Sequence, residues 1–197
     1  EWVQENVVVV AASAAFLLIV GIAALVITWQ QQRAAEASSS AYAEALLVEE
    51  PEARLAALEQ AISVGGPWQT EARYMLGEAA IAAGDYERAR AAMQQVRDQD
   101  DDGEYAPRAA DALGFLAERE GDLDTALEQY QAVVSNWPDT FPARRGHLRV
   151  ARVQEARGEI EAAVDAYRRQ VEVFPGSNAA ADAQAALDRL AQSHPEL

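Results

Sequence analysis

The stretch GDLDTALEQY, residues 121–130, determines the organisation of this chain because the sequence contains it in three versions. GDYERARAAM begins at Gly84 and GEIEAAVDAY begins at Gly158, so each version starts 37 residues after the previous one. Self-similarity with a fixed period of about 20 to 50 residues indicates a stack of structural repeats. We therefore expect one supersecondary unit to recur along this part of the chain.

Within each version the residue types fit a tight turn between two antiparallel helices. Glycine suits the left-handed residue that ends one helix, and the acidic residue after it suits the N-terminus of the next. A small residue then lets two backbones approach, and a bulky residue four positions later fills the gap on the same helical face. The small residues are Ala89, Ala126 and Ala163, and the bulky residues are Met93, Tyr130 and Tyr167.

The helix before each turn also carries a repeated pair of residues. The pairs are Leu76-Gly77, Leu113-Gly114 and Val150-Ala151. The last two units end at Pro138 and Pro175, whereas the first has Asp101 at that position. Because several unlike residues recur together at one spacing, the pattern resembles the tetratricopeptide repeat. It predicts an all-α solenoid of antiparallel helix pairs, with three repeats over residues 70–176 and a capping helix with a tail over residues 177–197.

Residues 33–69 are rich in alanine and charged residues, and we interpret them as a linker helix with a degenerate helix pair. No strong helix breaker stands between Trp29 and Leu47, so the first helix is expected to continue from the segment before it. A second helix is expected from about Glu52 to Val64.

The N-terminal part contains a long apolar run. Val7 to Thr28 are 22 consecutive residues without a charge, which is enough to cross a hydrocarbon core of about 30 Å as a helix. Trp2 and Trp29 flank the run, as interfacial aromatic residues do. We expect a transmembrane anchor with its flanks over residues 1–32. The alternative is a cleaved signal peptide, although its apolar core usually has only about 7 to 15 residues.

The charge and the cysteine count exclude several functions. The net charge is −16, so the chain lacks the basic surface that nucleic acid requires. The sequence contains no cysteine, so we expect no disulfide, thiolate metal site, cysteine nucleophile or lipid-modified N-terminal cysteine.

No residue pattern predicts catalysis, a metal site or a cofactor. The run from Asp98 to Glu104 opens like a calcium loop, but its twelfth position is Ala109 instead of a bidentate glutamate. We therefore interpret it as a polar connection between repeats. His147 is expected to be packed or half-buried, and His194 lies in the tail, so neither has a partner for general-base chemistry. We expect no enzyme.

One side of the first helix of each unit is expected to line a groove. Aromatic and aliphatic residues interleave there with charged ones, as in peptide-binding surfaces. The predicted protein-binding positions are Tyr74, Glu78, Ile81, Arg108, Asp111, Phe115, Arg145, Leu148 and Arg152. Some of these residues could instead fill core space in so short a solenoid, and both interpretations stay open.

The first helix of the third unit is unusually basic. It carries Arg144, Arg145, Arg149, Arg152 and Arg157. Arg145, Arg149 and Arg152 share a face because they lie three to four residues apart. They pair either with acidic helices of this chain or with a partner's carboxylates, which arginine binds bidentately.

The layout as a whole resembles the bacterial tetratricopeptide-like ancillary subunit of the Sec translocon. The positions that carry this resemblance are Trp2, Glu5-Asn6, Trp29-Gln30 and Ala41-Tyr42. The resemblance implies a single-pass protein of the inner membrane with a cytoplasmic N-terminus and periplasmic repeats. It also implies two kinds of partner, the translocon and a periplasmic chaperone or client polypeptide.

Charge alone gives a different orientation. Arg33 is the single basic residue near either end of the apolar run, and it favours repeats inside the cell. The sequence begins at Glu1 without an initiator methionine, so we expect upstream residues that could carry the deciding charges. We follow the orientation that the resemblance implies, with the cytoplasm-facing adaptor as the remaining possibility.

Two functions of different classes fit these observations. The first is a membrane-anchored scaffold for protein–protein interaction beside the Sec translocon. The second is a structural accessory or assembly subunit of another membrane complex, respiratory or photosynthetic. The small residues at 11–15 could let a partner helix approach in the bilayer, or they could simply face lipid.

Overall fold

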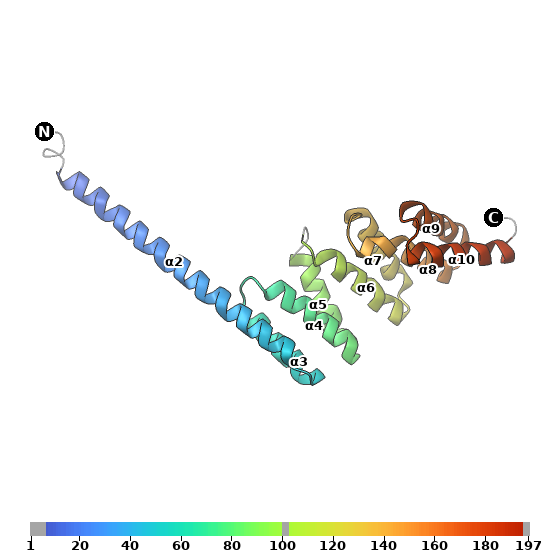
Figure 1. The fold of residues 1–197 in the computed structure, drawn as a ribbon, viewed down its shortest axis with the longest axis horizontal. Helices are drawn as coiled ribbons and strands as arrows, with labels where there is room; N and C mark the ends of the chain where they lie inside the picture. Colours follow the sequence, from blue (N-terminus) through green and yellow to red (C-terminus); the bar gives the residue numbers. More distant parts are fainter. Residues whose placement is uncertain (1–6, 100–102, 195–197) are drawn as a thin grey trace. The chain divides into compact units, whose positions relative to one another are not determined.

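The structure is a computed structural model that describes residues 7–99 and 103–194, without the side chains at positions 7–10, 13 and 14. Trp2 and the centre of the calcium-loop-like run, Asp100 to Asp102, lie outside the described residues, as do two side chains of the small-residue patch. The described residues form helices and turns and contain no strand, which confirms the predicted all-α class (Figure 1). The chain divides into two compact units, Glu1–Gln69 and Thr70–Leu197.

The first unit is a long helix paired with a short one. Helix α2 spans Val7–Leu47 without a break, as predicted, and α3 spans Pro51–Val64. Pro51 occupies the first turn of α3, where its missing N–H is tolerated, and the Glu50 carboxylate accepts hydrogen bonds from two backbone N–H groups of that turn. The expected start near Glu52 is therefore one residue late.

The end of α2 packs on α3. Tyr42 and Ala45 of α2 are buried together with Leu55 and Leu58 of α3. The Tyr42 ring also stacks on the Trp68 ring, with 5.6 Å between the ring centroids. This packing holds the last part of α2 in place.

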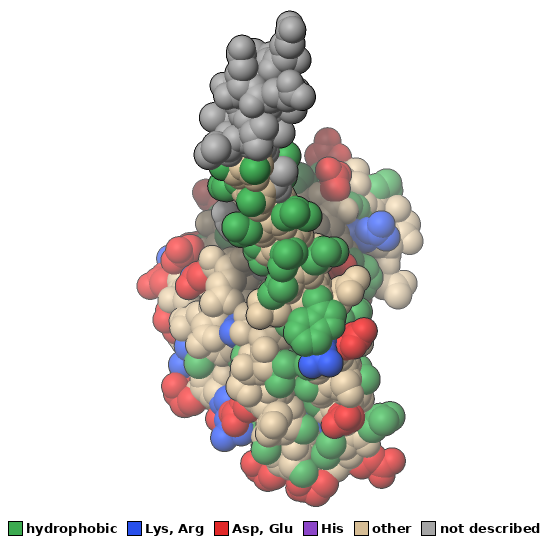
Figure 2. All heavy atoms as spheres, turned by 90° about the vertical axis from the view of Figure 1, so that its left-hand side faces the viewer, with side chains coloured by type: hydrophobic (Ala, Val, Ile, Leu, Met, Phe, Trp, Pro, Cys, Tyr) green, Lys and Arg blue, Asp and Glu red, His purple; other side chains and the backbone are tan. Residues whose placement is uncertain are grey.

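Among the described side chains of residues 11–33, none is buried. Hydrophobic side chains cover the face of this segment that Figure 2 shows. Phe16, Leu17 and Leu25 are each at least 65 % exposed. Within the described residues, α2 is the one helix that is long and apolar enough to cross a membrane.

The second unit is a row of antiparallel helix pairs, in which each helix from α5 onward packs on the next (Figure 1). The elements are α4 (Gln69–Ala83), α5 (Tyr86–Gln99), α6 (Ala106–Glu120), α7 (Leu123–Asn136), the 3-10 turn η1 (Pro142–Arg145), α8 (Gly146–Ala156), α9 (Ile160–Val173) and α10 (Asn178–Ser193). The predicted closing helix, α10, packs on α9 and contributes Ala183 and Leu190 to the core.

The three turn glycines adopt the conformation that the sequence predicts. Gly84, Gly121 and Gly158 have φ angles of 80°, 81° and 79°, which favour glycine. In two of the turns the acidic residue that follows caps the next helix. The Asp85 and Asp122 carboxylates accept hydrogen bonds from the backbone N–H groups of Arg88 and Thr125.

The small and bulky residues pack as predicted. Ala89, Ala126 and Ala163 are fully buried, and so are Met93 and Tyr130. The glycines of the first helices permit this packing. A Cβ atom on Gly77 would lie 2.6 Å from Met93 Cε, and one on Gly114 would lie 2.5 Å from Tyr130 Cε1.

We predict that Gly114→Ala destabilises the second unit by about 1 to 3 kcal/mol, because the added methyl group overpacks against the buried Tyr130 ring. Helix propensity alone favours alanine by about 1 kcal/mol. A lower free energy of unfolding would show that overpacking outweighs helix propensity, and a higher one would show the reverse. The measurement is chemical unfolding of the full chain in mild detergent, and a stabilised variant would contradict the packing described.

Candidate functional site

A cavity of about 490 Å³ opens along the first helices of the repeats. Its walls come from α4, α6, the η1 turn and the start of α8. The residues that line it are Tyr74, Glu78, Ile81, Arg108, Asp111, Ala112, Phe115, Phe141, Pro142, Arg145 and Arg149. We call this cavity the groove. The structure thus brings together seven of the nine predicted groove positions.

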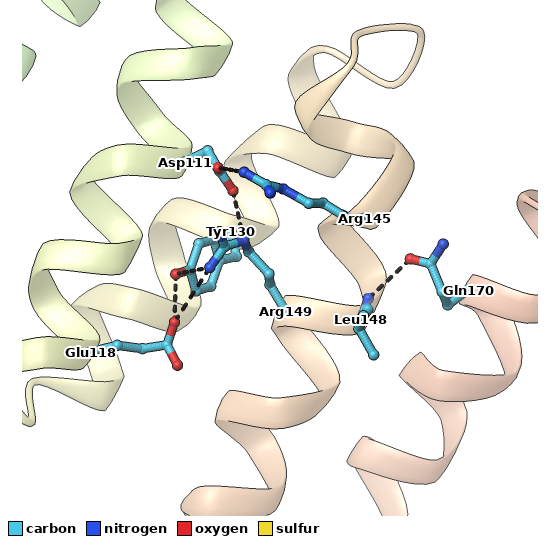
Figure 3. Close-up of polar contacts among 7 residues, drawn as sticks. All are labelled: Asp111, Glu118, Tyr130, Arg145, Leu148, Arg149 and Gln170. Atoms are coloured by element: carbon cyan, nitrogen blue, oxygen red, sulfur yellow. Dashed lines mark hydrogen bonds and ion pairs between the residues drawn. The ribbon is translucent and has the colours of Figure 1, made fainter. Parts of the chain in front are cut away.

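The other two positions lie elsewhere. Leu148 was expected to be exposed in the groove, but it is only 5 % exposed and belongs to the core that α8 shares with α9 and α10. Its backbone N–H donates to Gln170 Oε1 (Figure 3). Arg152 lines a separate cavity between α8, α9 and α10, where it pairs with Asp182 at 3.1 Å. Gln170 belongs to α9 and Asp182 to the capping helix α10, and counting helix positions from the turn glycines takes no account of these later helices.

The predicted groove positions did not include Ala112, Phe141, Pro142 or Arg149, although Arg149 was expected on the basic face with Arg145. Phe141 and Pro142 precede α8 in a turn that departs from helical periodicity, so counting helix positions could not place them. The signal was present in the segment TFPARR, residues 140–145, where a large aromatic residue stands next to a proline just before a helix. The Phe141 side chain is 69 % exposed, and it adds an apolar surface at the rim of the groove.

Two arginines hold a buried carboxylate on the floor of the groove. Asp111 is 8 % exposed. Arg145 Nη2 lies 2.7 Å from one carboxylate oxygen of Asp111, and Arg149 Nε lies 3.0 Å from the other (Figure 3). This arrangement joins α6 to η1 and α8. The positive charge of both arginines is therefore directed at a carboxylate of the same chain.

Two more arginines of the basic stretch pair within the chain. Arg152 pairs with Asp182, and Arg157 pairs with Asp124 at 3.0 Å and with Glu159 at 2.9 Å. Of the two interpretations of the basic helix, the structure favours pairing within the chain over a row of arginines that waits for a partner's carboxylates.

Tyr130 connects three helices beside the groove. Its hydroxyl donates to a Glu118 carboxylate oxygen and accepts from Arg149 Nη1 at 3.0 Å (Figure 3). The Arg149 guanidinium also lies over the ring, 5.1 Å from its centroid. Burial and the hydrogen bond to Glu118 raise the pKa of Tyr130. The hydroxyl therefore stays protonated and continues to donate.

The third repeat contains the same arrangement. The Tyr167 hydroxyl donates to Glu155 at 2.9 Å, and Arg189 binds both oxygens of that carboxylate at 2.7 and 2.8 Å. Burial and the bond to Glu155 raise the pKa of Tyr167 to about 12, and the hydrogen bonds from Arg189 lower the pKa of Glu155. Met93 occupies the equivalent position of the first repeat, so α4 and α5 pack there through apolar contacts.

Glu78 is the exposed acidic residue of the groove. Within the described part of the chain no ion pair to its carboxylate is present. Burial by neighbouring side chains is the main cause that raises the pKa of Glu78, and the charge of Asp111 adds to it. A hydrogen bond with Tyr74 and the more distant charges of Arg108 and Arg145 oppose the shift.

The structure does not bring the histidines to the groove. His147 is half-buried, as expected, and burial followed by the charge of Arg169 lowers its pKa. Within residues 7–99 and 103–194 no group of three or more histidine or acidic side chains is arranged to hold a metal ion.

We predict that Asp111→Asn destabilises the second unit by about 2 kcal/mol, because it removes the charge of the buried carboxylate and leaves Arg149 only its longer ion pair with Glu118 at 3.8 Å. Asp182→Asn is the matched control, since it removes the same charge from a pair in which both side chains are more than half exposed, and it should cost less than about 1 kcal/mol. Chemical unfolding of both variants measures the difference. Similar small losses would show that the Asp111 pair does not organise the groove.

Three solved structures share this fold. The crystal structure of MamA is 24 % identical, with a TM-score of 0.55 over 62 % of this chain and 67 % of that chain. A kinesin light chain protein with nearly identical TPR-like repeats from Podosopora anserina is 16 % identical, with a TM-score of 0.62 over 84 % and 89 %. BtubC from P. vanneervenii is 19 % identical, with a TM-score of 0.53 over 83 % and 66 %.

At these identities the structural similarity shows the fold alone. No curated protein matches the chain. The family comparison is more specific, because the model of the tetratricopeptide repeat-like domain matches residues 1–176, which include the N-terminal apolar helix together with all three repeats. The chain is therefore a member of the tetratricopeptide repeat-like domain family.

Proposed function

We propose that this chain is a membrane-anchored scaffold that holds a polypeptide partner in the groove of its repeats. The observation that carries the proposal is the groove itself, in which exposed apolar side chains stand beside charged and hydrogen-bonding ones. Tetratricopeptide-like folds typically serve as interaction scaffolds rather than enzymes, and such surfaces bind through large anchors in a partly polar setting.

The apolar part of the groove can receive a large side chain of a partner. Phe115 is half-buried and lines the cavity together with Phe141 and Pro142. Ile81 also lines it and packs on the core of α5 and α6. Because this core fixes Tyr74, Ile81 and Ala112, a partner loses little free energy in ordering these residues.

Helix α2 supports the anchoring part of the proposal. Its apolar side chains are exposed over a length that can span a bilayer. Near the end of this stretch the Arg33 guanidinium lies 4.1 Å from the centroid of the exposed Trp29 ring. A tryptophan beside an arginine suits the lipid–water interface. The family model also includes this helix along with the repeats, which favours an anchor over a cleaved signal peptide.

We place the repeats in the periplasm, next to the Sec translocon and a periplasmic chaperone or client. This placement rests on the resemblance of residues such as Trp29-Gln30 and Ala41-Tyr42 to the ancillary subunit of that complex. The anchor would raise the effective concentration of the groove near the membrane complex.

We predict that a photo-crosslinking amino acid at Phe115, introduced in intact cells, captures translocon subunits, a periplasmic chaperone or a translocating client. The same amino acid at Glu128, an exposed position of α7 outside the groove, is the control and should capture much less. Mass spectrometry identifies the products in the membrane fraction. Equal labelling at both positions, or labelling of bystanders alone, would contradict the proposal.

The competing function is a structural accessory or assembly subunit of another membrane complex. Purification in mild detergent through a C-terminal tag separates the two functions. A stoichiometric complex without any translocon component would favour the structural role, and protease access to the repeats from the cytoplasmic side would contradict the proposed orientation.

A further inference from the structure

The charges of the groove are not equally available to a ligand. Arg145 and Arg149 both bind Asp111, at 2.7 and 3.0 Å. Arg108 pairs with Glu104 at 2.8 Å, one helical turn earlier. The arginines that line the groove therefore already have carboxylate partners within the chain, and an incoming carboxylate would have to compete with those partners.

The situation of Glu78 is the reverse. Its carboxylate is exposed at the groove, within the described residues it has no ion pair, and the nearby charge of Asp111 disfavours its ionised form. The positive charges of Arg108 and Arg145 have the smallest effects on its pKa, and both arginines pair with other carboxylates. Neighbouring side chains keep part of the water away from the carboxylate and so disfavour its ionised form, and a cation placed against Glu78 would favour that form again.

Apolar surface lies beside this carboxylate. Ile81 is one turn further along α4, and Phe115 faces the same cavity from α6. Phe141 is 69 % exposed at the rim. A ligand that satisfies both features carries a positive charge next to a large apolar group, and in a polypeptide this means lysine or arginine next to an aromatic or branched aliphatic residue.

We propose that the groove binds an extended polypeptide segment in which a basic residue neighbours a large apolar one, with Glu78 as the partner of the basic side chain. This proposal rests on the function proposed above and specifies the ligand of the same groove. The net charge of −16 would speed the encounter with such a segment at low salt. An acidic segment or a free C-terminal carboxylate is the competing ligand.

The test uses three fluorescent seven-residue peptides that differ only at the centre, where lysine, glutamine or glutamate stands between leucine and phenylalanine. Binding to the full chain in mild detergent is measured by fluorescence anisotropy. We expect the lysine peptide to bind about tenfold more tightly than the glutamate peptide, because one charge-assisted contact is gained and one repulsion is avoided.

Three substitutions test which residues cause this preference. Glu78→Gln should weaken the lysine peptide about tenfold and leave the glutamine peptide nearly unchanged. Glu128→Gln removes the same charge from an exposed position outside the groove and should change nothing. Phe115→Ala should weaken all three peptides. A glutamate peptide that binds as well as the lysine peptide, or a Glu78→Gln variant that keeps the preference, would overturn the proposal.

The outcomes also separate this proposal from the function on which it rests. If all three peptides bind equally and Phe115→Ala weakens them equally, the groove binds polypeptides, but the assignment of Glu78 is wrong. If no peptide binds, the proposed ligand is wrong, and the crosslinks from position 115 then decide whether the groove serves as a binding surface at all.

The pH dependence gives an independent measurement. The groups that face Glu78 are Tyr74 on its own helix, Arg108 and Asp111 on α6, and Arg145 on η1. Because the pKa of Glu78 is raised in the free protein, the carboxylate takes up its proton at a higher pH than an ordinary glutamate does. A bound cation lowers that pKa, so binding is strongest above it and weakens as the pH falls through it.

We therefore predict that the affinity for the lysine peptide falls on mild acidification, whereas the affinity for the glutamine peptide stays flat. Glu78→Gln should remove the difference between the two curves. Identical pH curves for both peptides in the unmodified chain would contradict the role of Glu78.

Discussion

Tyr130 is the contact on which the arrangement of the groove depends. Its ring fills the space that Gly114 leaves on α6, and its hydroxyl lies between Glu118 of α6 and Arg149 of α8. One side chain from α7 therefore contacts both α6 and α8. Since α6 and the start of α8 both line the groove, their spacing there depends on this buried tyrosine.

An acidic chain uses its arginines mainly to join its own helices. Arg145 and Arg149 join α8 and the turn before it to α6, and Arg189 joins α10 to Glu155 of α8. Such pairs favour one register between neighbouring repeats, because a shifted helix would leave charge without a partner. These pairs also occupy the arginines of the groove. The exposed charge that is left without an ion pair among the described residues is the Glu78 carboxylate on α4.

Much of the fold can be predicted from the sequence, because its signals are local. The turn glycines, the buried alanines and the uninterrupted helix through Trp29 follow from conformational preferences and spacing. The groove is less predictable, because it depends on contacts between distant segments. Leu148 is covered by the helices that follow it, and Phe141 lies in a 3-10 approach to α8 that no helical count describes. The pairing of Asp111 with two arginines about one repeat away was equally hidden, since the sequence shows charges but not their partners.

The unbroken course of α2 has a mechanical consequence. The apolar stretch and the segment that packs on α3 belong to one helix, Val7–Leu47, with no turn between them. Each residue of an α-helix adds about 1.5 Å of rise and about 100° of rotation. If α2 spans a bilayer, the number of residues after Trp29 would therefore set the direction in which the α2–α3 hairpin points around the helix axis. Inserting one residue there would rotate the hairpin about that axis by about 100° and would move it only about 1.5 Å further from the lipid.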